Sequence, residues 1–306
     1  MLIINCAERE FRPKKRMLRM RDMFQRRIWS ISMACVALAA LVGKAAAAEG
    51  VVGLPKPWEI NFQTAFSPVM ERIHEFNYFL HFIVVGIVLL VLSILTWVIY
   101  RFNSRRNPVP SKTAHNTLLE VAWTVLPVLT LLVIVIPSLK LLYYSNKAET
   151  PDMTLKVTGH QWYWSYTYPD HGEFSFDSIP IPSEDLKPGQ PRLLAVDNPV
   201  VVPIGATVQV LVASDDVIHS WAVPSLGLKK DATPGRVNET WFRANQEGIF
   251  YGMCSELCGV NHYFMPIEVR AVSKEAFAAW VEEAKQKFAV NSHPQVDMAS
   301  NGSSPR

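Results

Sequence analysis

The chain has 306 residues, a formal net charge of +3 and a hydrophobic content of 49%, which is high for a soluble protein. The charge is divided unevenly: residues 1–143 hold 17 Lys and Arg against 8 Asp and Glu, whereas residues 144–306 hold 13 against 19. An acidic second half argues against nucleic acid as a ligand. It is compatible with a basic protein partner or with solubility alone.

The N-terminal residues have the order of a secretory signal peptide. Nine basic residues lie between Arg9 and Arg27, and an apolar stretch and a run of small residues follow. This order is typical of an exported protein. We therefore expect residues 1–48 to be a signal peptide and residues 49–74 to be an exported N-terminal segment. An uncleaved signal anchor is the alternative.

Two long uncharged runs come next. Residues 76–100 and 121–139 contain no Lys, Arg, Asp or Glu. A hydrocarbon core of about 30 Å needs about 20 apolar residues of helix. The runs predict a transmembrane helical hairpin over residues 75–143, with spans at about 75–100 and 117–143. A buried helical hairpin of a soluble protein is the alternative.

The loop between the two runs indicates the orientation in the membrane. It carries Arg101, Arg105, Arg106 and Lys112 and no acidic residue. Positively charged loops stay on the cytoplasmic side. We therefore predict a multi-pass protein of the bacterial inner (plasma) membrane with its C-terminal domain in the periplasm.

Residues 144–272 read as an all-β domain of Greek-key type. Short alternating runs rich in β-branched and aromatic residues are separated by Pro and Gly, as in "MTLKVTGHQWYWSYTYPD", "RLLAVDNPVVVPIGATVQVLVASDD", "NETWFRANQEGIFYGMC" and "FMPIEVRAV". Residues 273–290 are expected to form a C-terminal helix that begins after a capping Ser. The polar residues 291–306 are expected to be a disordered tail.

The stretch "CSELCGVNHYFM" holds Cys254, Cys258, His262 and Met265 within twelve residues. The other two cysteines of the chain, Cys6 and Cys35, would leave with the signal peptide. A disulfide is possible in an oxidising compartment but leaves the His and Met unexplained. Zinc does not use a thioether, and a nucleophilic Cys would not need a second thiol nearby. Thiolate, imidazole and thioether together favour copper.

Two thiolates can bridge two copper ions, each of which then needs one His and one weak ligand. The second His should come from a distant strand. We expect His219, 35 residues before Cys254, at the end of a strand over Val208–Ala213 and its following turn. The weak ligands would be Met265 and the backbone carbonyl of Glu256.

These motifs resemble subunit II of the haem–copper cytochrome c oxidases, of the bacterial aa3 type, over about residues 55–290. The resemblance rests on "LLEVAWTVLPVLTL", "GHQWYWSY", "HSWAVPSLGLKKDATPGR" and "CSELCGVNHYFMPIEV". It implies a cupredoxin fold that holds a binuclear CuA centre. It also implies that the centre accepts electrons from cytochrome c and passes them to haem in subunit I. There oxygen is reduced to water and protons are pumped, so the chain would be part of a proton-translocating cytochrome-c oxidase that also contains subunit III.

The resemblance assigns roles to individual residues. The copper ligands would be His219, Cys254, Glu256 through its carbonyl, Cys258, His262 and Met265. The carboxylate of Glu256, which we expect in a buried loop, would bind magnesium shared with subunit I. Trp162 would be the point where electrons enter, and Glu120 would lie at the mouth of a proton channel.

Three acidic residues are candidates for docking a lysine-rich cytochrome c: Asp177, Asp197 and Asp216. Two rival classes share part of the pattern. The related quinol oxidase subunit keeps the two spans but lacks the copper ligands, all of which are present here. A membrane-tethered copper chaperone would hold Cys, His and Met but would not need "GHQWYWSY" or Glu120.

Overall fold

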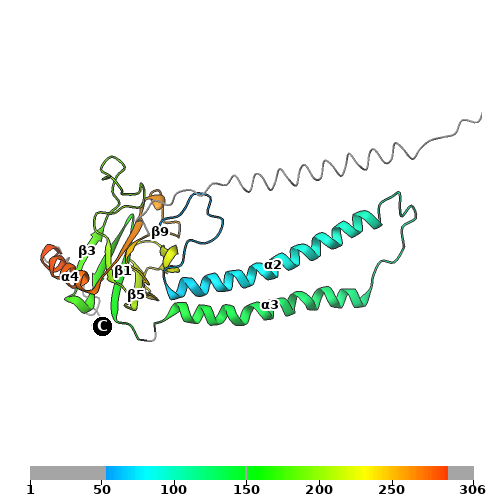
Figure 1. Ribbon diagram of the computed structural model, residues 1–306, viewed down its shortest axis with the longest axis horizontal. Coiled ribbons are helices and arrows are strands. Elements are labelled where there is room, and N and C mark those ends of the chain that lie inside the picture. Colours follow the sequence, from blue (N-terminus) through cyan, green and yellow to red (C-terminus); the bar gives the residue numbers. More distant parts are fainter. Residues whose placement is uncertain (1–52, 149, 289–306) are drawn as a thin grey trace, which may run out of the picture. The chain divides into compact units, whose positions relative to one another are not determined.

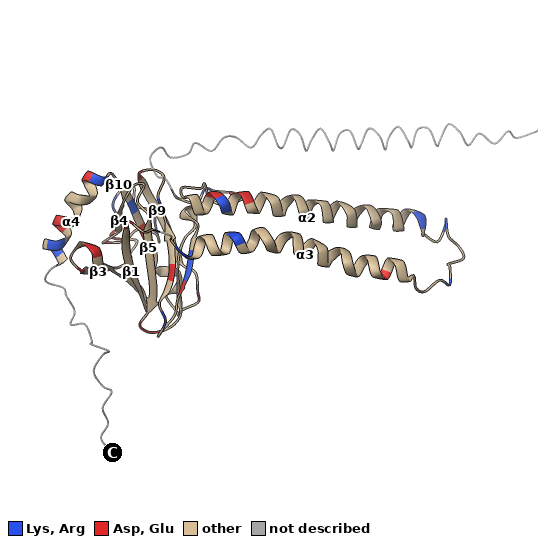
Figure 2. Ribbon diagram, turned by 90° about the horizontal axis from the view of Figure 1, so that it is seen from below, with Lys and Arg blue, Asp and Glu red and all other residues tan. Residues whose placement is uncertain are grey.

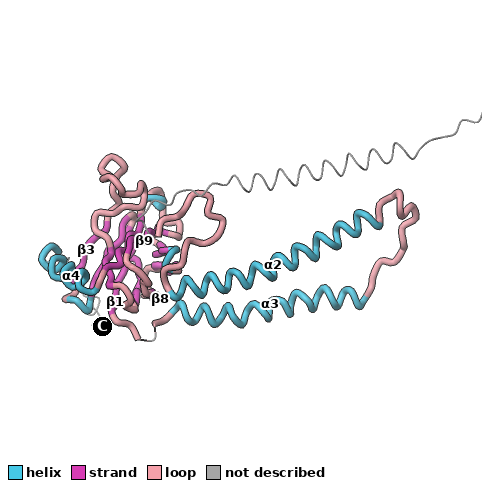
Figure 3. Tube along the Cα trace, viewed as in Figure 1, coloured by secondary structure: helices cyan, strands magenta, loops and turns pink. Residues whose placement is uncertain are grey.

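The computed structural model describes residues 53–148 and 150–288. The predicted signal peptide, with Cys6 and Cys35, and the predicted tail over 291–306 lie outside the described residues. Figure 3 distinguishes the two long helices from the strand-rich C-terminal domain.

Two long helices form a hairpin: α2 over Pro68–Arg101 and α3 over Thr117–Asn146. Each begins at a capping side chain, because Ser67 Oγ accepts a hydrogen bond from the Met70 amide at 3.0 Å and Asn116 Oδ1 accepts one from the Leu119 amide at 3.3 Å. Their long middle parts carry no charge, as Figure 2 shows. Both helices are long and apolar enough to cross a membrane, and their apolar side chains are exposed.

The start of α2 and the end of α3 contact the β domain directly. Ser67 Oγ donates a hydrogen bond to the Leu226 carbonyl at 2.7 Å, and Trp241 Nε1 donates one to the Tyr144 carbonyl at 2.7 Å. Val69, Ala148 and Trp241 form a small buried apolar cluster at this junction. The hairpin is thus joined to the domain by both polar and apolar contacts.

The domain consists of two five-stranded sheets (Figure 1). The first has the order β3-β2-β1-β5-β8, with β1 Met153–His160, β2 Tyr163–Tyr168, β3 Phe174–Ser178, β5 Val208–Ser214 and β8 Asn238–Phe242. The second has the order β4-β10-β9-β6-β7, with β4 Val200–Pro203, β6 His219–Val223, β7 Leu228–Ala232, β9 Gly248–Cys254 and β10 Pro266–Val272. Within the described residues the pairs β1/β5 and β4/β10 are parallel and the other pairs are antiparallel. The predicted fold class, a two-helix hairpin followed by an all-β domain, is confirmed.

The core lies between the two sheets. Strand alternation sends one face of β1 and β5 inward, so that Leu155, Val157 and Val210 are fully or almost fully buried. The largest core side chains are aromatic, and Trp221 Nε1 donates a hydrogen bond to the Tyr166 hydroxyl at 3.2 Å. The polar ends of these two rings are therefore satisfied inside the core, as buried Tyr and Trp require.

The structure corrects one prediction about the strands. His219 is not in the turn that follows the Val208–Ala213 strand; it opens β6, a strand of the opposite sheet. All five residues of β6 are buried, so the strand has no alternating pattern by which it could be recognised. Strands β3 and β7 were also not predicted. The sequence of β7 is "LKKDA", and its three charged residues do not resemble the apolar pattern of a strand.

The last helix, α4 over Lys274–Phe288, is amphipathic and capped by Ser273, whose Oγ accepts a hydrogen bond from the Ala276 amide at 3.1 Å. It buries Phe277, Val281, Ala284 and Phe288. Phe288 stacks on Phe176 of β3 with ring centroids 4.7 Å apart, so the helix closes the edge of the first sheet.

Replacing Gly252 with Ala should destabilise the domain by more than about 3 kcal/mol, the upper end of the usual cost of overpacking. The added Cβ would overlap the carbonyl oxygen of Ala222, a backbone atom of β6 that cannot turn aside. Thermal unfolding of the purified chain measures the effect. The matched control is Gly235→Ala, where the backbone has φ +71 but open space surrounds the position, and a loss of only about 1–2 kcal/mol is expected. Equal losses in the two variants would contradict the prediction.

Candidate metal centre

The loop between β9 and β10 folds back on itself. Strand β9 ends at Cys254 and β10 begins directly after Met265. The Cys254 amide donates a hydrogen bond to the Met265 carbonyl at 3.2 Å, and the Ser255 amide donates one to the Ser220 carbonyl at 3.0 Å. These bonds fix both ends of the loop against each other and against β6.

His219 reaches the loop from β6. Its ring is fully buried and meets the Trp164 ring edge-on, with centroids 5.9 Å apart. A Cβ on Gly159 would lie 2.9 Å from the His219 ring, so β1 can pass behind the imidazole only because that residue is a glycine. The ring is thus held between two strands of one sheet and the loop of the other.

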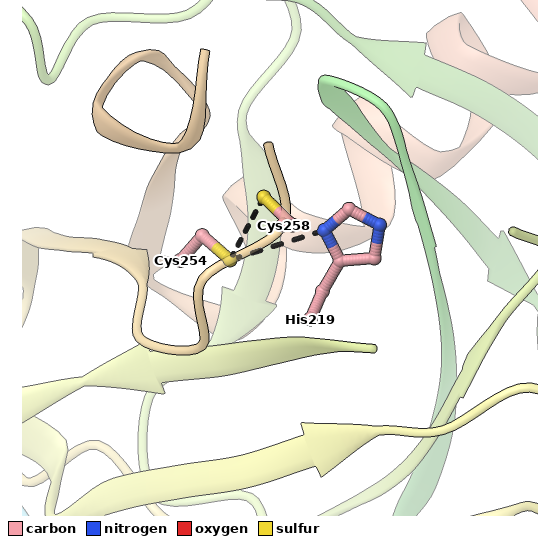
Figure 4. Close-up of side chains that lie close together, drawn as sticks. All are labelled: His219, Cys254 and Cys258. Atoms are coloured by element: carbon pink, nitrogen blue, oxygen red, sulfur yellow. Dashed lines mark hydrogen bonds between the residues drawn. The ribbon is translucent and has the colours of Figure 1, made fainter. Parts of the chain in front are cut away.

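Six donor groups converge between β6 and the loop. Cys254 Sγ lies 3.9 Å from His219 Nδ1 and 3.9 Å from Cys258 Sγ (Figure 4). Cys258 Sγ lies 3.6 Å from His262 Nδ1 and 3.5 Å from Met265 Sδ. The sixth group is the Glu256 carbonyl oxygen, 3.3 Å from Cys254 Sγ. All the ligand atoms that the sequence suggested therefore lie around the two sulfur atoms.

The two cysteines are free in the structure. Their sulfur atoms are 3.9 Å apart, whereas a disulfide bond needs about 2.05 Å. His219, Cys254 and Cys258 place one ligand atom each within 4.8 Å of one another, which is a geometry that can hold a metal ion. Two thiolates, two imidazoles and a thioether are the donors that suit copper, and the thioether has no use at a zinc site.

The surrounding groups shift the pKa values of the two thiols in opposite directions. Burial alone would raise the pKa of Cys254, but hydrogen bonds from His219 and from the backbone near it outweigh burial and lower this pKa to about 7. Burial and the neighbouring Cys254 charge raise the pKa of Cys258 to about 12. In the absence of a metal Cys254 is therefore about half ionised at neutral pH and Cys258 is protonated, and a cation bound by both sulfurs would release the remaining protons.

Asp216 is one of the predicted docking residues, and the structure places it behind His219. Its Oδ1 lies 2.8 Å from His219 Nε2, and its Oδ2 accepts a hydrogen bond from the Gln161 amide at 2.6 Å. This contact directs Nδ1 of the ring towards Cys254, as carboxylates behind metal-binding histidines do. The sequence analysis missed this role, although the three-residue spacing to His219 was visible.

The other two docking candidates are exposed and bonded within the domain. Asp177 accepts a hydrogen bond from Ser165 Oγ at 2.6 Å, and Asp197 accepts one from the Ile179 amide at 2.7 Å. Nothing in these contacts tests a role in docking, which stays a prediction for both residues.

Trp162 lies directly on the Cys258 segment. Its indole Nε1 donates a hydrogen bond to the Cys258 carbonyl at 3.3 Å, and Gln161 Nε2 donates to the same oxygen at 2.8 Å. A Cβ on Gly259 would lie 2.9 Å from the indole ring, so the glycine makes room for this contact. The indole is half-buried, which leaves part of its surface open to a partner.

Glu256 and Glu120 differ in their surroundings. The Glu256 side chain is exposed, so the expectation of a buried loop is wrong at this residue, although its carbonyl oxygen lies 3.3 Å from Cys254 Sγ. Glu120 lies in the first turn of α3, where its Oε1 accepts a hydrogen bond from the Asn116 amide at 3.2 Å. Glu120 thus also serves as part of the helix N-terminus.

Replacing Asp216 with Asn should lower the pKa of His219 in the metal-free chain. Burial of the ring opposes protonation, but hydrogen bonds and charge interactions with Cys254 and Asp216 outweigh it, and the pKa of His219 lies above its ordinary value of 6.5. A raised pKa means that the protonated ring contributes stability at pH below 6.5, and that this contribution is lost as the pH rises through the folded-state pKa. The variant should therefore lose less stability over that pH window.

A pH titration of the His219 ring by NMR measures the change, and chemical unfolding at several pH values measures its effect on stability. The control is Asp215→Asn, because this neighbouring acid lies 3.8 Å from His160 and is not bonded to His219. An unchanged His219 pKa in the Asp216 variant would contradict the prediction.

Two family models match the chain. "Cytochrome C oxidase subunit II, transmembrane domain" matches residues 55–141, and "Cytochrome C oxidase subunit II, periplasmic domain" matches residues 153–272. The probable cytochrome c oxidase subunit 2 of Rickettsia bellii is 53% identical over 237 residues, which cover 78% of this chain and 88% of that protein. The cytochrome c oxidase subunit 2 of Cereibacter sphaeroides is 44% identical over 253 residues, which cover 77% of this chain and 83% of that protein.

A crystal structure of the periplasmic domain of subunit II of cytochrome oxidase from Bradyrhizobium japonicum is 55% identical and covers 46% of this chain and 99% of that domain, with a TM-score of 0.44. The two family models together extend over both the hairpin and the β domain. The chain therefore belongs to the cytochrome c oxidase subunit II family.

Proposed function

We propose that this chain accepts electrons from cytochrome c at a binuclear copper centre and passes them to haem in subunit I of the oxidase. The observation that supports the centre is the convergence of His219, His262, Met265 and the Glu256 carbonyl on two sulfur atoms 3.9 Å apart. Bound there, the copper pair would supply a carrier that takes up and releases one electron at a time.

The chain's own contribution is a rigid and shielded set of ligands. His219 and Met265 are fully buried, and Cys254 and Cys258 nearly so. Asp216 holds one imidazole from behind, and two side-chain donors hold the Cys258 carbonyl. Ligands that cannot move on a change of charge keep the reorganisation small, and the buried position keeps water away from the sulfur atoms.

A membrane-tethered copper chaperone remains the rival function. A chaperone must release its cargo, so its ligands should be exposed and mobile. Four of the proposed ligands, His219, Cys254, Cys258 and Met265, are instead buried, and His262 is half-buried, which favours a resident cofactor over an exchangeable one.

Trp162 is proposed as the point where electrons enter. Its half-buried indole is joined to the Cys258 carbonyl by a hydrogen bond. A docked cytochrome c could therefore contact one side of a ring whose other side touches a ligand-bearing segment. Exposed Asp177 and Asp197 are proposed to attract the basic surface of that partner.

The proposal also includes the position of the chain in the membrane and its partner subunits. The basic loop after α2 supports a position in the bacterial inner membrane with the β domain in the periplasm, and cleavage near Ala48 would release the signal peptide. Subunits I and III are proposed partners in a proton-translocating complex. The exposed Glu256 carboxylate would contribute to a magnesium site shared with subunit I.

Copper analysis of the purified chain tests the centre. We expect two copper ions per chain and an electron spin resonance signal split by both nuclei, because Cys254 and Cys258 would together hold the pair. Cys258→Ser should abolish the shared signal, whereas Ser255→Ala, an exposed neighbour in the same loop, should keep it. One copper ion per chain in the unmodified protein would contradict the proposal.

Replacing Trp162 with Phe should slow reduction of the centre by cytochrome c about tenfold, equivalent to about 1.4 kcal/mol of barrier. The variant loses the bond to the Cys258 carbonyl but no proposed ligand. Stopped-flow reduction measures the rate, and copper content verifies that the centre is intact. Tyr163→Phe is the adjacent control, with an unchanged rate expected. An unchanged rate for the Trp162 variant would remove its assigned role.

Replacing Glu120 with Gln should lower oxygen consumption of the assembled oxidase about tenfold or more, as expected when a proton-transferring group is removed. Reduction of copper by cytochrome c should keep its rate, because Glu120 lies in the first turn of α3 and none of the proposed copper ligands does. Glu75→Gln, in the first part of α2, is the control and should keep normal turnover. Normal turnover in the Glu120 variant would leave that residue with its helix-capping role alone.

A further inference from the structure

A pocket of about 840 Å³ lies where α2 begins and α3 ends against β8. Its walls consist of aromatic, small and basic side chains: Arg72, Tyr143, Tyr144, Lys147, Ala148, Thr150, Thr207, Trp241 and Arg243. Every charged residue among them is basic. The proposed electron-transfer function uses none of these residues.

The three basic groups have no acidic partner within the described part of the chain. The Arg72 guanidinium stacks over the Tyr144 ring at 3.5 Å from its centroid. The Nε atom of Arg243 is buried and forms no hydrogen bond with any described residue. The salt bridges of the described residues include neither of these arginines nor Lys147. An anion in the pocket would supply the missing charge and the missing acceptor.

The position of the pocket along the helices places it at the membrane surface. The uncharged run of α2 begins at Phe76, one turn after Arg72, and that of α3 ends at Leu139, two turns before Lys147. A helix of 34 residues is about 50 Å long, whereas the hydrocarbon core is about 30 Å thick, so the helix ends extend among the lipid headgroups. Tyr143 and Trp241 are the aromatic residues that favour this level.

A second pocket, of about 340 Å³, lies between the two helices, about one turn further from the β domain. Phe76, Phe79, Pro137 and Leu141 give it apolar walls, and Arg72, Glu75 and Lys140 complete its lining. Arg72 lines both pockets. A ligand that occupies both must therefore have an anionic head and an apolar chain, joined at the level of Arg72.

We propose that the two pockets bind one anionic phospholipid. Its phosphate pairs with Arg72, Lys147 and Arg243, and one acyl chain lies in the groove between α2 and α3. A zwitterionic lipid has the same phosphate, but none of the described residues that line the larger pocket is an acid that could pair with its positive group. The proposal rests on the membrane-spanning hairpin and is independent of the metal centre.

The assembled oxidase provides the test. The complex is stripped of lipid in detergent and incubated with phosphatidylglycerol or phosphatidylcholine, and native mass spectrometry then counts the lipid retained per chain. We expect one phosphatidylglycerol under conditions that remove phosphatidylcholine. Each basic group near an anionic headgroup contributes about 1 kcal/mol, or about fivefold in affinity. The double variant Arg72→Gln, Arg243→Gln should therefore bind phosphatidylglycerol about 25-fold more weakly.

The matched control is Arg101→Gln, Arg106→Gln. It removes two arginines that also lie over aromatic rings, Arg101 at the opposite end of α2 and Arg106 in the loop that follows. This control should retain the tightly bound lipid, and copper content should verify the assembly of both variants. Equal retention of the two lipids, equal loss in the two double variants, or displacement of the lipid by inorganic phosphate alone would each overturn the proposal. Binding to the isolated chain but not to the complex would also overturn it, because a neighbouring subunit would then fill the pocket.

Discussion

The structure of the domain depends on holding two thiol groups 3.9 Å apart, out of water and unbonded to each other. A negative charge at such a position is costly unless donors or cations surround it. The fold meets this requirement by placing His219 and the backbone of Glu256 and Ser220 within hydrogen-bonding reach of Cys254. The lowered pKa of Cys254 is the electrostatic result, whereas Cys258 keeps its proton until a cation binds.

The rest of the domain serves to bring His219 to that loop. Strand β6 carries the histidine between β9 and β7 of one sheet, and Gly159 of the other sheet leaves room for its ring. Gly252 lets β9 approach β6 closely, so the histidine and Cys254 lie on neighbouring strands. The two glycines are thus as necessary to the site as the ligands themselves, although neither has a side chain to contribute.

The sequence was most informative where a pattern is local. The two uncharged runs predicted the hairpin directly, and the compact Cys, His and Met stretch predicted a metal site in the loop between β9 and β10. It was least informative where burial or charge hides the period of a strand, as in the fully buried β6 and in "LKKDA" of β7. The contact of Asp216 with His219 could not be predicted either, because the direction of a carboxylate in a turn depends on the backbone that surrounds it. Its acidic character suggested an external partner, whereas its geometry points inward.

The distance along the chain between His219 and Cys254 has a consequence for the order of events during biogenesis. The two residues are 35 positions apart and become neighbours only when β6 pairs with β9. The two sheets of the domain also contain one parallel pair each, β1 with β5 and β4 with β10, and these pairs connect segments far apart in the sequence. Such pairings form late, because the entropy of closing long loops must be overcome first. A complete set of the proposed ligands therefore exists only after the domain has folded, and metal loading is confined to that last stage.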